Sequence, residues 1–230
     1  MAEELKETGL NRLDGESSSV RLVRDDYGLA LVGDGMELRG DFSRMLPRLR
    51  QGRLQQELLV KAARIRGAEA PTAVDCTAGL GEDSLLLAAA GFAVTLFERD
   101  QTIAALLADA LERAAADPRL AEAVGRMTLV AGNSITGLAT LPEPPDVVYL
   151  DPMFPARTKS AAVKKKFQLL HHLEQPCEEE EALVAAALAA QPRKVVIKRP
   201  AKGALLAGMK PSYSVAGKAV RYDVLVPPRP

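Results

Sequence analysis

The strongest indication of the fold lies in residues 74–84, which read Val74-Asp75-Cys76-Thr77-Ala78-Gly79-Leu80-Gly81-Glu82-Asp83-Ser84. An apolar run ends at Asp75 and an Ala- and Leu-rich run follows the second glycine, so the stretch predicts a strand, a tight loop and a helix. Gly79 and Gly81 let the backbone turn sharply and approach a ligand with no Cβ in the way. The loop is therefore a candidate nucleoside-binding loop, with a plain turn as the alternative. Asp75, at the expected strand end, suits a ligand that carries an ammonium group.

On either side of this loop, short apolar runs alternate with Ala- and Leu-rich runs, which is the pattern of parallel strands joined by crossover helices. The predicted strands are residues 73–76, 93–97, 127–130, 146–150 and 194–198. The predicted helices are residues 83–90, 101–116, 134–139, 159–173 and 178–190. Two β-rich segments around Gly217 predict a terminal hairpin. The predicted fold class is α/β, a Rossmann-like doubly wound sheet with a C-terminal hairpin.

The residues before this domain divide into two parts. Residues 1–19 are polar and without hydrophobic periodicity, which predicts a loose N-terminus. Residues 20–40 contain short alternating runs punctuated by glycines, which predict a small β meander. Residues 53–66 place apolar side chains at Leu54, Leu58, Ala62 and Ile65, which predicts one amphipathic linking helix. The expected domains are therefore a small β-rich subdomain with its helix over 20–66 and the main domain over 67–230.

Two further candidate ligand residues follow the second and third predicted strands. Glu98 ends the second strand, where a carboxylate can accept hydrogen bonds from both hydroxyls of a ribose; an exposed acid at a strand end is the alternative. Asn133 and Ser134 follow the third strand, beside the expected position of an adenine. Asn133 can recognise the edge of the base, whereas Ser134 can equally be only a helix N-cap.

The fourth strand runs into Asp151-Pro152-Met153-Phe154-Pro155, the most informative motif of the chain. Pro152 has a fixed φ and no N–H, which makes the turn stiff. Asp151 and the carbonyl of Pro152 can each accept a hydrogen bond from an exocyclic NH2 group, which would direct the nitrogen lone pair toward an incoming methyl group. Phe154 can stack on the same base. The alternative is an ordinary proline turn with a core phenylalanine.

Composition limits the remaining possibilities. The chain has 230 residues, of which 47% are hydrophobic and 26% charged, which is typical of a globular protein with a full core. No apolar run reaches the roughly 18 residues of a membrane helix, and the first residues lack a signal-peptide pattern. Cys76 and Cys177 lie far apart and His171 and His172 are adjacent, so neither a disulfide nor a metal site is expected. We expect a cytoplasmic protein.

The zero net charge conceals a difference between the two parts of the chain. Residues 1–150 hold 16 basic and 23 acidic side chains, whereas residues 151–230 hold 14 and 7. The basic part can face a polyanion, and a solvated surface is the alternative. Seven cations near the same predicted sheet edge are candidate phosphate contacts of an RNA: Lys159, Lys164, Lys165, Lys166, Lys198, Arg199 and Lys202.

These motifs together resemble the ribosomal RNA small subunit methyltransferase J family. The resemblance rests on residues 75–83, 97–99, 149–155 and 159–165, with Lys198-Arg199-Pro200 and residues 218–223 in matching order. It implies the class I S-adenosylmethionine-dependent fold and methylation of the N2 amine of a guanine in 16S rRNA, with rRNA or the small ribosomal subunit as partner and S-adenosylhomocysteine as product. By position it also implies cofactor contacts, which are Glu82, Asp83, Glu98, Arg99, Asn133, Ser134 and Asp151.

Other functions remain open from the residues alone. An amino methyltransferase acting on another base or on protein glutamine would use the same acidic turn. A nicotinamide-dependent Rossmann oxidoreductase would use the glycine loop and Glu98, but leaves the acidic turn unexplained. A non-enzymatic RNA-binding module of the same fold is the third alternative.

Overall fold

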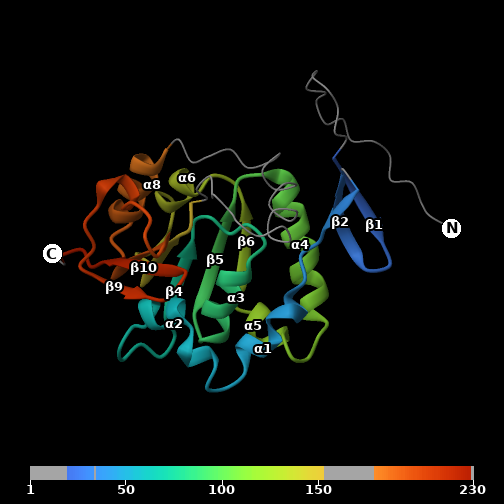
Figure 1. Cartoon of the computed structure of the whole chain (residues 1–230), viewed down its shortest axis with the longest axis horizontal. Helices are drawn as coiled ribbons and strands as arrows, with labels where there is room; N and C mark the ends of the chain where they lie inside the picture. Colours follow the sequence, from blue (N-terminus) through green and yellow to red (C-terminus); the bar gives the residue numbers. More distant parts are fainter. Residues whose placement is uncertain (1–19, 34, 153–178, 229–230) are drawn as a thin grey trace.

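The computed structural model describes residues 20–33, 35–152 and 179–228, and its centre is one seven-stranded sheet (Figure 1). The strand order is β6-β5-β4-β7-β8-β10-β9. Their bounds are Thr72–Asp75 for β4, Ala93–Glu98 for β5, Met127–Ala131 for β6, Val147–Leu150 for β7, Lys194–Pro200 for β8, Tyr213–Ala216 for β9 and Val220–Leu225 for β10. Strands β4 to β8 pair in parallel, and β10 lies antiparallel to both β8 and β9. The chain enters the sheet at β4 and extends it in both directions, so the predicted doubly wound sheet with its terminal hairpin is confirmed.

Helices cover both faces of this sheet. They are α3 (Glu82–Ala89), α4 (Gln101–Ala115), α5 (Ala121–Val124), α6 (Ser134–Leu138) and α8 (Glu180–Ala189). All but the short α5 were predicted, with ends within two residues, whereas the helix expected over 159–173 lies outside the described residues. In the described ranges, no helix is long and apolar enough to span a membrane.

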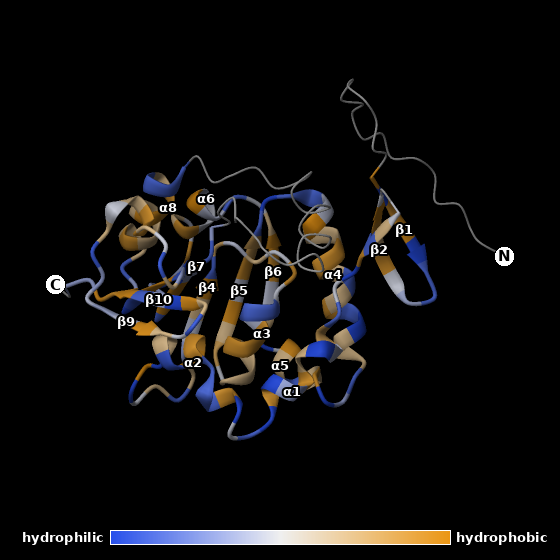
Figure 2. Cartoon of the chain, in the orientation of Figure 1, coloured by the Kyte–Doolittle hydropathy of each residue, from blue (hydrophilic) through white to orange (hydrophobic). Residues whose placement is uncertain are grey.

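Alternating side chains of the strands build two cores, as the period of two along a strand requires. One face buries Tyr149, Val196 and Val224 together with side chains of α2 (Leu58–Ala63) and α3. The other face buries Val148 and Ile197 against α6 and α8. Figure 2 shows the hydrophobic residues concentrated on these central strands. The inner strands β4, β7 and β8 therefore hold their carboxyl ends at one fixed edge.

The predicted N-terminal meander is confirmed as an antiparallel sheet of β1 (Arg21–Asp25), β2 (Gly28–Gly33) and β3 (Met36–Leu38). It packs against α4, where Leu31 and Leu38 form a core with Ile103 and Leu106. The sheet lies beyond α4, at the opposite end of the molecule from the C-terminal hairpin (Figure 1). The expected domain boundary near residue 66 stays a prediction.

The single helix expected over 53–66 is wrong. The chain forms a 3-10 turn, η2 (Leu54–Gln56), and then α2, because Glu57 between them adopts an extended ψ of 130°. A double hydrogen bond from Arg48 holds the Glu57 carboxylate at 2.9 and 2.7 Å. The break shifts the register, so that Leu59 rather than Leu58 is buried. Arg48 lies within α1 (Leu46–Leu49). It therefore precedes residues 53–66, whose periodicity predicted the single helix.

Candidate active site

The glycine loop joins β4 to α3 as predicted, and its two glycines have different roles. Both adopt positive φ, +53° at Gly79 and +75° at Gly81, a region that other residues enter only at a cost. A Cβ on Gly81 would lie 2.8 Å from the Leu107 side chain, so this glycine is required for packing. A Cβ on Gly79 would meet nothing within 4 Å. Gly79 therefore presents bare backbone to open space, where a ligand can approach.

The Asp75 carboxylate lies inside the protein and does not face a ligand, which corrects the expectation that it meets an ammonium group. The residue is 1% exposed. One carboxylate oxygen accepts from the Thr77 N–H at 3.0 Å, and the other accepts from the Ser84 hydroxyl at 2.6 Å. Burial raises the pKa of Asp75 to about 7. Asp75 thus ties the loop to the first turn of α3.

Glu98 ends β5 beside the glycine loop, as predicted. Its Oε2 accepts from the Gly79 N–H and its Oε1 from the Asp100 N–H, both at 2.9 Å. Burial raises the pKa of Glu98, against the opposing effect of these N–H donors. Each carboxylate oxygen has two acceptor positions, so the group can hold the loop and still accept from a diol. The neighbouring Arg99 is exposed, and its Nη1 lies 3.9 Å from Glu179 Oε2.

Asn133 and Ser134 follow β6, and the helix N-cap is Asn133 rather than Ser134. Asn133 is the N-cap of α6, where its Oδ1 accepts from the Ile135 N–H at 2.8 Å. Its exposed side chain keeps the amide NH2 for another acceptor. Ser134 is not the N-cap, and its side chain is buried. The expected cofactor contact of Ser134 stays a prediction.

Asp151 follows β7 at the carboxyl edge, within a cluster of two carboxylates and one cation. Its side chain is 34% exposed, and its backbone N–H donates to Thr77 Oγ1 at 2.7 Å. Lys198 Nζ, from β8, lies 2.8 Å from Asp151 Oδ2 and 2.6 Å from Asp83 Oδ2. In the described part of the chain, Asp151 Oδ1 has no side-chain partner. The cluster thus fixes one carboxylate oxygen and leaves the other as an acceptor. Pro152, directly after it, is buried.

Tyr149 holds one carboxylate of this cluster, Asp83, in place. Its buried hydroxyl donates to Asp83 Oδ2 at 2.7 Å, and its ring centroid lies 6.5 Å from that of Tyr222. Burial and then the negative Asp83 raise the pKa of Tyr149 well above its usual value. The hydroxyl therefore remains a donor, and it holds Asp83 where the carboxylate can share Lys198 with Asp151.

The pKa of Asp151 is set by burial and by Lys198, which act in opposite directions. Burial raises the pKa of Asp151, and the Lys198 cation opposes that rise. Burial alone would lower the pKa of Lys198, but Asp83 and Asp151 together raise it well above its usual value. Lys198 is accordingly protonated at any physiological pH and stabilises the negative charge on Asp151.

The predicted RNA contacts are only partly placed by the structure. Lys198 pairs with two carboxylates while 27% of its side chain stays exposed, and Arg199 is buried with its Nε donating to the Ala204 carbonyl at 2.8 Å, so a phosphate contact of either residue stays a prediction. Lys202 is exposed and stays a prediction. The others lie outside the described residues, as does Phe154: Lys159, Lys164, Lys165 and Lys166.

Sequence reasoning missed the roles of Tyr149, Thr77 and Lys198. A signal for Tyr149 was present, because it stands two residues before Asp151, and residues two apart along an extended chain point to the same face. Lys198 ends the run Lys194-Val-Val-Ile-Lys198 at the edge where Asp151 was already expected. That placement indicated a partner for the acid as readily as a phosphate contact.

Comparison with known proteins decides the family. The family model "putative SAM-dependent methyltransferase" matches residues 6–227. A ribosomal RNA small subunit methyltransferase J from Thioalkalivibrio sulfidiphilus is 46% identical, with 93% of this chain and 88% of the relative covered. The chain belongs to the ribosomal RNA small subunit methyltransferase J family. A second relative of the same name, from Neisseria meningitidis, is 40% identical over 92% of this chain and 85% of its own.

The methyltransferase also resembles a solved structure. The crystal structure of a SAM-dependent methyltransferase from Neisseria gonorrhoeae matches with a TM-score of 0.75 and 32% identity, covering 93% of this chain and 85% of that one. The fold is thus the class I S-adenosylmethionine-dependent fold, and the cofactor is S-adenosylmethionine. The nicotinamide-dependent oxidoreductase alternative is wrong. The residues fit the cofactor, because Gly79 offers open backbone next to the Glu98 carboxylate.

Proposed function

We propose that this methyltransferase methylates the exocyclic N2 amine of a guanine in small-subunit (16S) rRNA. The names of the relatives support the rRNA substrate. The observation that carries the chemistry is the Lys198-paired Asp151, one-third exposed at the end of β7. We infer a cytoplasmic location from such a substrate.

The glycine loop and its neighbours would hold the cofactor. Gly79 offers its backbone, Glu98 accepts from the ribose hydroxyls, and Asn133 offers its amide to the base. The predicted contacts of Glu82, Asp83 and Arg99 join them. Bound S-adenosylmethionine supplies an electrophilic methyl group on a positively charged sulfur.

Asp151 positions the amine. Its Oδ1 accepts one N–H of the guanine amine, so that the nitrogen lone pair is directed away from the carboxylate. The predicted second acceptor is the Pro152 carbonyl, and the predicted stacking partner of the base is Phe154. Lys198 keeps Asp151 ionised, since a protonated acid would no longer offer two acceptor oxygens. Fixed orientation of this kind is worth up to about 7–11 kcal/mol of a barrier in favourable cases.

The target guanine has to be accessible. A base paired inside a helix exposes too little of this amine, so the target lies in a loop or turns outward at a cost of a few kcal/mol. Stacking on Phe154 would offset part of this cost.

The test is methyl transfer to small subunits isolated from a strain that lacks this methylation. With labelled S-adenosylmethionine, the wild-type protein should label the rRNA, and nucleoside analysis should find N2-methylguanosine. Asp151→Asn keeps the size of the side chain but removes its charge, and should lower kcat at least about 100-fold. Asp26→Asn, the same change at an exposed turn, is the matched control.

Label on adenine, cytosine or protein glutamine would show that the amine belongs to another substrate. A wild-type rate in Asp151→Asn would remove the proposed role of the carboxylate. Equal binding of S-adenosylmethionine by both variants excludes loss of the fold as the cause of a lower rate.

A further inference from the structure

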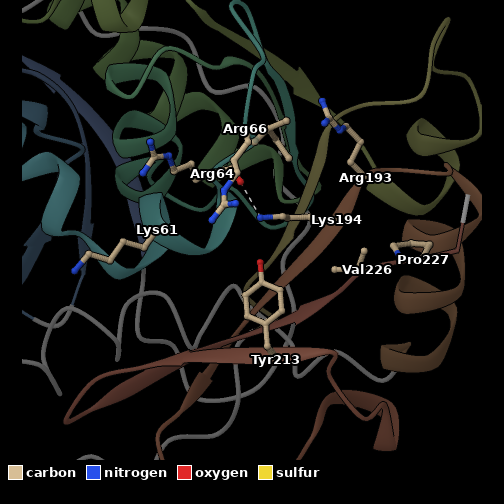
Figure 3. A pocket seen from close by; sticks show the side chains of 9 residues that line it. Lys61, Arg64, Arg66, Arg193, Lys194, Tyr213, Val226 and Pro227 are labelled. Carbon is tan, nitrogen blue, oxygen red and sulfur yellow. Dashed lines mark hydrogen bonds between the residues drawn. The ribbon is translucent and has the colours of Figure 1, made fainter.

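A basic cleft lies at the opposite edge of the sheet from the active site. Its volume is about 640 Å³, and it lies between the end of α2, the start of β8 and the open end of the β9–β10 hairpin (Figure 3). Lys194 begins β8 in the cleft and Lys198 occupies the active site four residues later. At about 3.3 Å per residue, the two side chains leave the strand about 13 Å apart. The cleft is therefore not part of the cofactor site.

The charge of the cleft is of one sign. Five of its nine lining residues are cations and none is acidic: Lys61, Arg64, Arg66, Arg193 and Lys194. Arg193 pairs with Asp146, outside the lining, at 3.2 Å. The other four have no carboxylate within ion-pair distance in the parts of the chain that the structure describes. The cleft thus concentrates four positive charges that no carboxylate of the described residues neutralises.

One of the cleft cations, Lys194, is held in place by hydrogen bonds within the protein. Lys194 Nζ donates to the carbonyls of Ala62 at 3.2 Å and Arg64 at 2.8 Å, which ties the end of α2 to β8. The exposed side chains of Lys61, Arg64 and Arg66 make no such contacts among the described residues. They are available to a ligand without loss of any contact to the described residues.

The aromatic ring of Tyr213 lies among the cations that line the cleft. Tyr213 is 42% exposed and points from β9 toward Lys194, whose Nζ lies 5.7 Å from the ring centroid (Figure 3). Val226, at the end of the same hairpin, is 48% exposed. Cations that contact phosphates beside an aromatic ring that stacks a base are the features of sites for single-stranded nucleic acid. The volume also exceeds the need of a free phosphate and suits nucleotide-sized groups.

We propose that this cleft binds a single-stranded segment of the rRNA substrate, with phosphates on Lys61, Arg64 and Arg66 and a base stacked on Tyr213. The inference rests on the proposed function for the identity of the RNA. It adds a second contact, at the edge of the sheet remote from the methylated base. The substrate then touches the protein at two separated places.

The test measures binding of the unmethylated small subunit, without methyl transfer, as a function of salt. The variant Lys61→Ala/Arg64→Ala/Arg66→Ala should bind at least about tenfold more weakly at moderate salt. Loss of three single-strand phosphate contacts should also reduce the slope of log K against log salt by about 2. The control Arg21→Ala/Arg50→Ala/Arg53→Ala removes the same charge from exposed positions outside the cleft and should have the smaller effect.

The stacking contact has its own test. Tyr213→Ala should weaken binding about 5- to 150-fold, whereas Tyr213→Phe keeps the ring and should bind as the wild type. The affinity for S-adenosylmethionine should be the same in all variants, because the cleft lies away from the glycine loop.

Equal affinities of the two triple variants would overturn the proposal. The proposal would also be overturned if the cleft variant lost the binding of inorganic phosphate but bound the small subunit as tightly as the wild type. The cleft would then be a site for small anions. Failure of the proposed function is distinct, because it appears as absent methyl transfer by the wild type, whatever the binding results are.

Discussion

Replacing Lys198 with methionine tests whether the cation acts as a positioning residue for Asp151. The substitution keeps much of the side-chain volume and removes the charge that lies 2.8 Å from Asp151 and 2.6 Å from Asp83. Two carboxylates then share a partly buried site with no cation between them. The pKa of Asp151, already raised by burial, should rise further.

The size of this rise follows from the geometry. A cation in contact with a carboxylate lowers its pKa by about 1–3 units, and the one-third exposure of Asp151 places the effect in the lower part of that range, at about 1–2 units. In the proposed mechanism catalysis requires the carboxylate, so activity should be lost as the pH falls through the pKa of the folded enzyme. Because the variant has the higher pKa, its acid limb should lie about 1–2 pH units above that of the wild type.

The assay is the pH profile of kcat/KM with small subunits as substrate, since this profile reports the ionisations of the free enzyme. Lys218→Met, at an exposed position of the hairpin, is the control and should leave the profile unchanged. An acid limb that stays in place, or moves to lower pH, would refute the assigned role of Lys198. A uniform loss of activity at all pH values would show that the cation acts on geometry alone.

Two further predictions concern the loop and its support. Gly81→Ala should destabilise the fold by about 2–5 kcal/mol, because it adds the overpacking of a Cβ 2.8 Å from Leu107 to the strain of a positive φ. Gly79→Ala should cost only that strain, about 1–2 kcal/mol, and mainly weaken S-adenosylmethionine binding; thermal unfolding and cofactor titration separate the two. Asp75→Asn should remove a pH dependence of the free energy of unfolding. Since burial raises the pKa of Asp75 to about 7, wild-type stability falls as pH rises from about 4 to 7, by up to about 4 kcal/mol, and the variant should gain on the wild type over that range in denaturant unfolding. A constant difference in stability between the two proteins from pH 5 to 8 would contradict this assignment.

The parts of the site that sequence reasoning located share one property. Gly79, Glu98 and Asp151 each follow an apolar strand, and parallel strands bring their carboxyl ends to one edge. The order of strands and residues along the chain was therefore enough to bring these three together. No side-chain contact had to be known.

The errors arose where the outcome depends on side-chain contacts between different structural elements. Asp75 was expected to face a ligand because it ends a strand, but Ser84, nine residues later, turns its carboxylate inward. The helix over 53–66 was expected from periodicity, but Arg48 holds Glu57 in an extended conformation. Likewise, nothing local distinguishes a lysine that contacts phosphate from Lys198, whose partners lie on two other elements. Propensity and pattern describe a segment, and these residues are governed by their tertiary partners.

With the active site at one edge of the sheet and the proposed RNA-binding cleft at the other, the molecule would have a means of selecting large substrates. Strands β7 and β8 are buried on both faces, so the distance between the acidic cluster at one edge and the basic cleft at the other is fixed by covalent geometry and packing. A short oligonucleotide that carries the target base can reach only one of the two sites. A structured subunit can reach both, and the second contact then acts at a high effective concentration. The proposed arrangement therefore places discrimination between free RNA fragments and the small subunit in KM, while kcat depends on Asp151 and its neighbours. The triple cleft variant should lose this discrimination and methylate both substrates with similar KM.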